Sequence, residues 1–430
     1  MKGVLFLILT IFASVLGREG YGPYDQEWGY VNVREQAYIF WWLYFTNATQ
    51  NPYERPLAIW LQGGPGASSV GYGNFEEIGP LDENLNLRNY TWVKDLNLLF
   101  VDNPVGTGFS YVDDLRAIPT TNKQIALDFV EFLKGFYTAL PQFEPVPLYI
   151  FCESYGGKMT AEIALELDQA IKRGEIKSNL TGIVLGDSWI DPYHSVESWS
   201  EYLFNVGAID SNGVEALQQT TRELKTAIDE ERWEDATDIW RTAESDVYIY
   251  AGGIDFYNIL TEIDDYYVQE LKRQNPLRRI AKRELREVDS LDGIMKNVKN
   301  ALNLTSNWGD FEIYVFDFLT GDFMKPVTDV VERLLNETTI SVNVLSGQLD
   351  LIVATPGTVK WVEDLKWKNA SQYLKAPRRG FSVNGIYEGY EKSYGTFTFY
   401  WVLRAGHMVP ADNPKGMQYI LEKVTNNYSV

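Results

Sequence analysis

The chain has 430 residues, of which 45% are hydrophobic and 23% charged, so its composition is that of a globular protein and not of a disordered one. Its 59 acidic residues outnumber its 38 basic residues, which gives a formal net charge of −21. Nucleic-acid binding depends on a surplus of Lys and Arg that neutralises phosphates, so this balance excludes a nucleic-acid partner and argues against an anionic membrane surface. The length allows two average domains or one large α/β domain with an insertion.

The N-terminus has the pattern of a secretory signal peptide. Lys2 supplies a basic start, residues 4–16 form an apolar run, and residues 15–17 offer a small-residue cleavage site. The run is shorter than the roughly 18 to 20 apolar residues that span a bilayer, and no later stretch reaches that length. We therefore predict a signal peptide over residues 1–17 and no membrane anchor. The alternative is that this run is itself an anchor or a buried core helix.

Seven N-x-[ST] sequons follow, at Asn47, Asn89, Asn179, Asn303, Asn336, Asn369 and Asn427. A single sequon arises easily by chance, but seven behind a signal peptide predict a glycosylated protein of the secretory pathway, either secreted or lysosomal. Cys152 is the only cysteine, which excludes an intramolecular disulfide. That is unusual for a secreted enzyme and fits an acidic, degradative compartment.

The predicted elements begin with a pair of strands in the aromatic and β-branched stretch 27–45. Short apolar runs then end abruptly in Gly, Pro, Asn or Asp, at residues 57–61, 98–101, 148–151 and 183–185. Stretches with a 3.6-residue period, such as 125–137 and 159–171, lie between them and predict helices. Strands that alternate with helices predict a mainly parallel sheet covered on both faces.

The segment from about residue 195 to 310 is charge-dense and mostly helical in pattern, for example at 214–240 and 265–300. The strand pattern resumes at 341–345 and 397–403. We therefore expect an α/β core made of residues 18–195 and 311–430, interrupted by a helical cap over residues 196–310. The basic stretch 272–286 within this cap is either a processing loop or, more simply, a solvated helical face.

Ser154 lies at a predicted strand-to-helix junction, followed at +2 and +3 by glycine. This is the setting of a nucleophile elbow, a tight turn that exposes a serine hydroxyl above a sheet and requires small flanking residues. The usual motif is G-x-S-x-G, whereas Cys152 occupies the −2 position here. Ser154 is our candidate nucleophile, with a chance pentapeptide match as the alternative.

A nucleophilic serine needs an adjacent base, normally histidine, and the chain has only His194 and His407. In hydrolases with such an elbow the order is Ser, then Asp or Glu, then His, which favours His407. His194 is interpreted as a surface or capping histidine. Asp350 follows the predicted strand 341–345 and is our candidate acid, which would orient the imidazole. A helix N-cap is the alternative role for Asp350.

An oxyanion also requires two hydrogen-bond donors. The amide of Tyr155 supplies one, and the glycine-rich turn at residues 63–66 is the source of the other, since a Cβ there would block the approach of the backbone. All of these loops leave the carboxyl ends of predicted strands, where open α/β sheets place their sites. We expect no metal and no cofactor, because His-Glu-x-x-His, Rossmann and P-loop motifs are absent from the sequence.

Together these motifs resemble those of the serine carboxypeptidases, an α/β-hydrolase family that removes residues from peptide C-termini. The matching segments are residues 60–69 (WLQGGPGASS), 102–110 (DNPVGTGFS), 153–157 (ESYGG), 347–350 (GQLD) and 406–410 (GHMVP). They follow one another in order over nearly the whole predicted mature chain. The resemblance implies an α/β-hydrolase fold with a mixed, mostly parallel sheet, helices on both faces and an inserted helical cap.

The resemblance also implies a set of site residues. The catalytic triad would be Ser154, Asp350 and His407, with an oxyanion hole from the amides of Gly64 and Tyr155. A subsite for the terminal carboxylate of the substrate would be built from Trp60, Gln62, Gly63, Glu77 and Glu153. The two glutamates make physical sense as a pair that shares a proton, because the neutral acid donates a hydrogen bond to an anion. Peptidase activity is therefore expected to favour acidic pH.

Two departures from the family pattern stand out. The family usually has Asn where Gln62 stands, and Ala67 replaces a cysteine that is common after Gly-Gly-Pro-Gly. The second departure agrees with a chain that lacks the family's disulfides. The thiol of Cys152, two residues from the nucleophile, is interpreted as packed and inert.

We therefore predict a serine-type carboxypeptidase that acts on peptide or protein C-termini through a Ser154 acyl-enzyme. Two alternatives remain at this stage. One is an acyltransferase or esterase of the same fold, a function found among plant relatives, and the other is a catalytically silent secreted binding protein. The presence of nucleophile, base, acid and both oxyanion donors argues against the second.

Overall fold

The computed structural model describes residues 18–263, 288–309 and 312–425. The predicted signal peptide, the basic stretch 272–286 and the sequon at Asn427 lie outside these ranges. Among the helices of the described ranges, none combines the length and apolarity that crossing a membrane requires.

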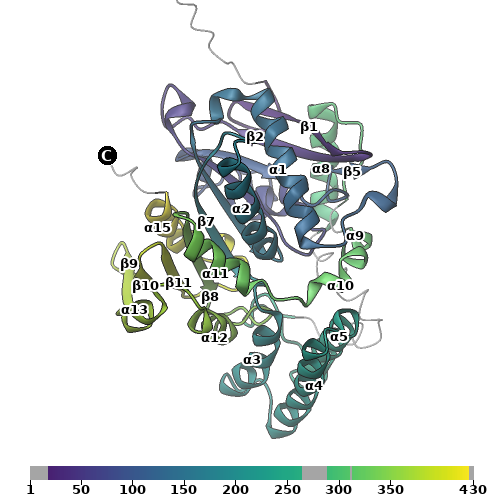
Figure 1. Ribbon diagram of the computed structural model, residues 1–430, viewed down its shortest axis with the longest axis vertical. Coiled ribbons are helices and arrows are strands. Elements are labelled where there is room, and N and C mark those ends of the chain that lie inside the picture. The colour runs from purple at the N-terminus through teal and green to yellow at the C-terminus, as the bar shows by residue number, and fades with distance from the viewer. Residues whose placement is uncertain (1–17, 264–287, 310–311, 426–430) are drawn as a thin grey trace, which may run out of the picture.

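The strands of the described ranges join in one mixed sheet of eleven. They are β1 (Gln26–Arg34), β2 (Ala37–Tyr44), β3 (Leu57–Leu61), β4 (Asn97–Val101), β5 (Tyr111–Val112), β6 (Pro147–Ser154), β7 (Asn179–Ser188), β8 (Ser341–Gly347), β9 (Arg379–Val383), β10 (Ile386–Tyr394) and β11 (Phe397–Val402). Their order is β1-β2-β4-β3-β6-β7-β8-β11-β10-β9, and β5 pairs with β2 (Figure 1). The six strands from β4 to β11 in this order are parallel, and the outer strands pair antiparallel.

Helices connect and cover these strands. The α-helices are α1 (Asn122–Ala139), α2 (Gly156–Lys172), α3 (Pro192–Asn205), α4 (Ser211–Asp229), α5 (Trp233–Tyr250), α8 (Val288–Leu302), α9 (Ile313–Phe318), α10 (Thr320–Phe323), α11 (Thr328–Glu337), α12 (Thr355–Asp364), α13 (Ala370–Lys375), α14 (Val409–Asp412) and α15 (Pro414–Val424). A π-helical segment, η2, spans Ser69–Ile78, and single 3₁₀ turns lie at Pro52–Glu54, Trp92–Lys94, Leu115–Ala117 and Pro141–Phe143.

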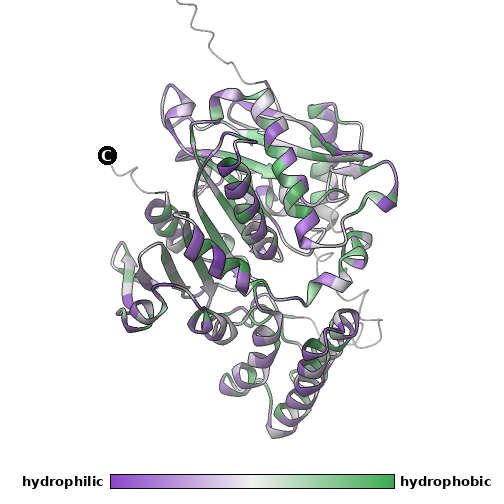
Figure 2. Ribbon diagram, viewed as in Figure 1, coloured by the Kyte–Doolittle hydropathy of each residue, from purple (hydrophilic) through white to green (hydrophobic). Residues whose placement is uncertain are grey.

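Close backbone approaches place helices on both faces of the sheet. Trp60 and Leu61 are consecutive on β3, so their side chains point to opposite faces. A Cβ at Gly73 of η2 would lie 2.2 Å from the Trp60 ring, whereas a Cβ at Gly156 of α2 would lie 3.2 Å from the Cβ of Cys152, the residue of β6 in register with Leu61. Both η2 and α2 therefore pack tightly on the sheet, and Figure 2 shows the hydrophobic strands enclosed by helices with polar outer surfaces. The predicted α/β architecture is confirmed.

The predicted central strands and the two core helices are all found in the structure. The predicted strand pair corresponds to β1 and β2, and α1 and α2 extend the predicted helices by a few residues at each end. The helical pattern at 214–240 proves to be two helices, α4 and α5. Glu231 between them has a φ of +55°, a left-handed turn that ends a helix. The hairpin of β9 and β10 carried no clear sequence signal, because many of its residues are exposed.

All the helices from α3 to α11 lie in the sequence between β7 and β8. Of these, α3, α4 and α5 project from one end of the sheet (Figure 1). This projection is fastened back to the core by contacts such as the bond from the Trp199 indole of α3 to the carbonyl oxygen of Ile352, which follows β8, at 3.3 Å.

A buried carboxylate at the end of β4 ties together two loops near the carboxyl edge of the sheet. Asp102 is fully buried, and its oxygens accept hydrogen bonds from the Ser68 hydroxyl (2.8 Å), the Val70 amide (3.1 Å) and the Phe109 amide (2.8 Å). A Cβ at Gly108, where φ is +55°, would lie 2.1 Å from this carboxylate. Glycine is therefore required in that turn. The motif at residues 102–110 is thus a structural brace.

Replacing Asp102 with alanine should destabilise the protein strongly. Three donors that are buried beside it would lose their acceptor, and the free energy of unfolding should fall by roughly 3 kcal/mol or more. Urea denaturation of Asp102→Ala against the unchanged protein measures this loss. The exposed Asp113 in the same segment provides a matched control, and Asp113→Ala should leave the midpoint unchanged. Equal midpoints for the two variants would contradict the role of Asp102 as a brace.

Candidate active site

The backbone at Ser154 forms a strand–turn–helix elbow. Strand β6 ends at Ser154 and α2 begins at Gly156, and Ser154 itself has a φ of +60°. A left-handed conformation costs a non-glycine residue roughly 1–2 kcal/mol. The glycines that follow permit close packing, since a Cβ at Gly157 would lie 2.2 Å from the Ser188 side chain on β7. The turn therefore needs the small residues that the sequence provides.

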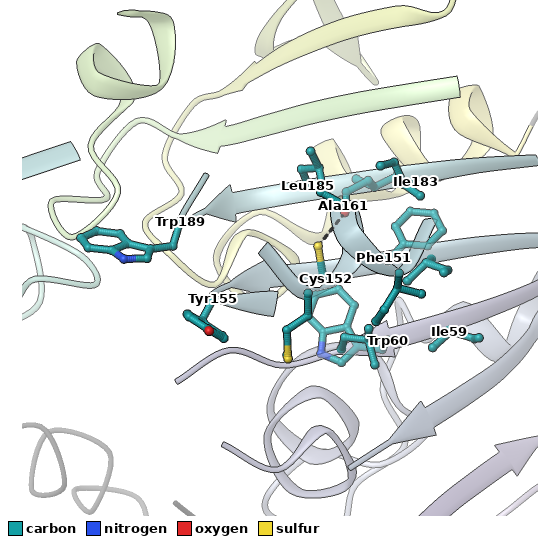
Figure 3. Close-up of a cluster of buried hydrophobic side chains, with 14 of the residues drawn as sticks. Ile59, Trp60, Phe151, Cys152, Tyr155, Ala161, Ile183, Leu185 and Trp189 are labelled. Carbon is teal, nitrogen blue, oxygen red and sulfur yellow. Dashed lines mark hydrogen bonds between the residues drawn. The ribbon is translucent and has the colours of Figure 1, made fainter. Parts of the chain in front are cut away.

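Cys152, the residue at the unusual −2 position, is packed on the far side of this turn. Figure 3 shows its sulfur on the side of Ala161 and Leu185, and its thiol donates to the Val184 carbonyl oxygen at 3.1 Å. Burial raises the pKa of the thiol to about 11. The thiol is therefore neutral at any physiological pH, in agreement with the packed and inert role expected for it.

His407 and Asp350 form a buried pair. The imidazole Nδ1 lies 2.8 Å from Oδ2 of Asp350, and the two side chains are 3% and 0% exposed. The other oxygen of Asp350 accepts the Val353 amide at 3.2 Å. The ring of Tyr257 stacks on the imidazole with centroids 4.9 Å apart, and the His407 amide donates to the Tyr257 carbonyl oxygen. These contacts fix the imidazole and leave Nε2 as the nitrogen that can act as base.

Ser154 and His407 line one cavity of about 230 Å³, together with Gln62, Gly63, Gly64 and Glu153. The glycine turn lies directly against the elbow. A Cβ at Gly63 would be 2.5 Å from the Ser154 Cβ and 2.9 Å from the Tyr155 nitrogen. The backbone of this turn and the amide of Tyr155 therefore meet beside the serine. This arrangement suits the stabilisation of a negative oxygen formed there.

A chain of hydrogen bonds runs behind the cavity wall. The Trp60 indole donates to the Gln62 side-chain oxygen at 2.7 Å, and the Gln62 amide nitrogen donates to Glu153 at 3.0 Å. Gln62 is also hydrogen-bonded to Glu77, so its side chain links the indole to both glutamates. The side chain of Gln62 is longer than that of the family's usual Asn, and it is accommodated because the Trp60 indole fixes the Gln62 oxygen.

Glu77 is buried beside Glu153 and Gln62. Burial raises the pKa of Glu77 to about 7, against smaller effects from these two neighbours that lower it. Burial and the negative charge of Glu77 raise the pKa of Glu153 further. The Glu77 side chain is hydrogen-bonded to Glu153 and Gln62, and two carboxyls share a hydrogen bond only when one of them carries a proton. At acidic pH the pair therefore carries at least one proton.

The predicted site residues thus gather at one edge of the sheet in two layers. Gln62, Gly63, Gly64, Glu153, Ser154 and His407 line the cavity, while Trp60, Glu77, Tyr155 and Asp350 are buried and are not among its lining residues. His194 lies apart, in the first turn of α3. Its Nδ1 is 2.8 Å from Asp191, which also caps that helix, and this bond raises the pKa of His194. The cap of this helix is therefore Asp191, and His194 is a first-turn residue that contacts the cap.

Sequence reasoning missed several residues of the cavity wall, namely Tyr72, Glu76, Tyr248, Asp255, Tyr257, Asn258, Thr261, Ile263 and Asp412. Six of these follow or end α5, in a segment with no catalytic motif, so only the folded structure places them. Glu76 precedes Glu77 in η2 and Asp412 belongs to α14, and neither had a spacing that pointed to the site. Within the described ranges, no three His, Cys, Asp or Glu side chains are grouped as metal ligands.

The strand order, the elbow at the end of β6 and the loops at the carboxyl edge define an α/β-hydrolase fold. Among solved structures, the chain is similar to the prohormone-processing carboxypeptidase KEX1(delta)p from Saccharomyces cerevisiae. The TM-score is 0.80 at 22% identity, and the match covers 94% of this chain and 91% of that one. At this identity the likeness shows the fold.

Sequence comparisons give the family. The profile of the serine carboxypeptidases matches residues 18–427. Retinoid-inducible serine carboxypeptidases are 44% identical in Rattus norvegicus and 43% identical in Homo sapiens, each over 90% of this chain and 88% of the relative. Serine carboxypeptidase-like 51 of Arabidopsis thaliana is 36% identical over 91% of this chain and 90% of its own. The chain therefore belongs to the serine carboxypeptidase family, and it is a hydrolase of peptide substrates, as predicted.

The buried acids of the site should make the protein more stable at acidic than at neutral pH. The pKa values of Glu77 and Asp102 rise on folding from 4.5 to about 7 and from 3.8 to about 6. The native state therefore binds more protons than the unfolded state between about pH 4 and pH 7, and the free energy of unfolding falls as the pH rises through that window.

Urea unfolding at a series of pH values across this window measures the slope. Glu77→Gln should flatten it, because the amide does not titrate. A stability that rises from about pH 4.5 to about pH 7.5 would contradict the expectation.

Proposed function

We propose that Ser154, His407 and Asp350 are the catalytic triad of this carboxypeptidase. The observation that carries the proposal is the 2.8 Å pair of His407 and Asp350, whose imidazole lines the same cavity as the strained Ser154. In this mechanism the Ser154 hydroxyl attacks the last peptide carbonyl and His407 Nε2 takes its proton. The amides of Gly64 and Tyr155 bind the oxyanion.

Collapse of the tetrahedral intermediate breaks the C–N bond, and His407 returns the proton to the leaving amine. The released product is the C-terminal amino acid, and the remaining peptide is an ester on Ser154. Water, activated by the same imidazole, then hydrolyses that ester and restores the serine. Asp350 accepts the Nδ1 hydrogen throughout and stabilises the imidazolium that forms twice per turnover.

The exopeptidase specificity is proposed to come from the carboxylate subsite. The side-chain amide of Gln62, the backbone at Gly63 and the protonated member of the Glu77–Glu153 pair would bind the terminal carboxylate. Trp60 orients Gln62 through the indole bond, and Glu77 acts through Glu153, since neither lines the cavity. This assignment gives the longer Gln62 side chain a defined role in place of the family's usual Asn.

We also propose that the protein enters the secretory pathway and is secreted or lysosomal. The sequons at Asn47, Asn89, Asn179, Asn303 and Asn336 are exposed, and Asn369 is partly exposed, so glycans at these positions meet no packing barrier. The higher stability expected at acidic pH agrees with an acidic compartment.

The proposed nucleophile is tested by incubating the purified protein with peptides of varied C-termini between about pH 4 and pH 8 and following the products by mass. Stepwise loss of C-terminal residues is expected, strongest at acidic pH. Ser154→Ala should lower kcat by about 10³-fold or more while leaving the unfolding midpoint unchanged. A variant that retains full turnover would overturn the assignment.

The carboxylate subsite is tested through the pH dependence of KM. For a peptide with a free C-terminus, KM should rise as the pH passes about 7, because Glu77 then ionises and the negative charge of the pair repels the substrate carboxylate. A C-terminally amidated peptide lacks that charge, so any turnover of it should show no such rise. The double variant Glu77→Gln, Glu153→Gln should remove the rise for the free peptide. If both its affinity and its pH profile match the unchanged protein, the subsite assignment is wrong.

A further inference from the structure

Asp187 is a buried acid that lies directly behind the triad. It is 1% exposed near the end of β7, with a φ of +38° that is rare for a residue with a side chain. Its Oδ1 accepts the Gly347 amide of β8 at 2.7 Å. The carbonyl oxygen of Gly347 in turn accepts the amide of Asp350. Strand pairing between β7 and β8 therefore sets Asp187 beside the loop that carries the triad acid.

The second oxygen of Asp187 has no donor. Oδ2 is buried and unpartnered, and the neighbouring side chain that contacts Asp187 is the carboxyl of Asp350. Both oxygens of Asp350 already accept hydrogen bonds, one from His407 and one from the Val353 amide. This is the environment of an ionised carboxylate. Two buried carboxyls in contact are stable only when one of them carries a proton that joins them.

The charged groups around Asp187 favour that protonated form. Asp350, from the loop after β8, and Asp412, from α14, both raise its pKa, and burial raises it most. The charge of Asp187 in turn raises the pKa of Glu153 on β6. His407 lines the same small cavity as these two acids. A negative charge on Asp187, in addition to the one on Asp350, would stabilise the imidazolium of His407. The free base would then be depleted at acidic pH, where the enzyme is expected to work.

We propose that Asp187 is a positioning residue that carries a proton on Oδ2 and donates it in a hydrogen bond to Asp350. This bond orients the Asp350 carboxylate towards His407 and keeps the buried pair at a single negative charge. The inference rests on the triad proposed above and adds a group that acts on the reaction only through Asp350. Asparagine has the same shape, with an oxygen to accept from Gly347 and an N–H to donate to Asp350.

The test is the pH dependence of inactivation by an uncharged alkyl fluorophosphonate. This probe has no terminal carboxylate, so titration of Glu77 and Glu153 does not affect its binding through the carboxylate subsite. The Ser154 oxygen bonds to phosphorus, fluoride leaves, and His407 takes the serine proton. The acid limb of the rate profile therefore reports the pKa of His407. The variants are Asp187→Asn and Asp187→Ala, with Asp246→Asn as a control for loss of an acid that is partly buried elsewhere.

Asp187→Asn should keep the inactivation rate and leave the acid limb in place, because it replaces one neutral donor with another. Asp187→Ala should lose about tenfold or more in rate, since a hydrogen bond to a charged group is removed. Asp246→Asn should match the unchanged protein. Thermal unfolding of each variant identifies any that fail to fold, and Asp187→Asn alone still tests the protonation state.

Two outcomes would overturn the inference. If Asp187→Asn moves the acid limb down by about one pH unit or more, the native residue is charged. If a folded Asp187→Ala reacts as fast as the unchanged protein, the bond to Asp350 does not matter. Failure of the proposed triad has a different signature, because the unchanged protein itself would then not react, or Ser154→Ala would react equally well.

Discussion

The left-handed backbone at Ser154 is the constraint on which the geometry of the site depends. A non-glycine residue at a φ of +60° is strained, and the strain persists because β6 is paired on both sides and α2 starts immediately behind the turn. The chain can turn this tightly only where neighbouring backbones approach without a Cβ. Gly63 and Gly156 provide those approaches, so the same steric requirement that strains the serine also brings the glycine turn against the Tyr155 amide.

Burial decides the chemistry of the acids around this turn. Glu77, Glu153, Asp187 and Asp350 are all removed from water within one edge of the sheet. An isolated buried carboxylate is too costly, so each either pairs with a donor or keeps its proton. Asp350 receives donors on both oxygens and is suited to be the anion. The other three have raised pKa values and are suited to be proton carriers, in agreement with the acidic pH preference proposed for the site.

The sequence predicts the parts of this site that depend on local backbone rules. The elbow, the glycine turn and the order of Ser154, Asp350 and His407 follow from glycine positions and strand ends, and the structure brings those segments together. Gly73 or Asp187 could not be assigned in this way, because their roles depend on which side chains meet across the sheet. The role of Tyr257 is even less predictable from the sequence, since this residue stacks on His407 from a segment that contains no motif. Long-range contacts of this kind have no signature in a single sequence.

Two such contacts join the helices between β7 and β8 to the reacting groups. On one side, Lys158 of α2 is fully buried and lies 3.1 Å from Asp322 in α10, which also accepts the Tyr155 hydroxyl at 3.3 Å. On the other side, the backbone of the segment after α5 both donates to and accepts from the loop of Asp350, and it accepts the amide of His407. Loss of only one partner of a buried ion pair strongly destabilises a protein, because the other charge stays buried without a partner. The inserted helices therefore do more than cover the cavity, because Tyr155, the proposed oxyanion donor, and His407, the proposed base, are both fixed by contacts with them.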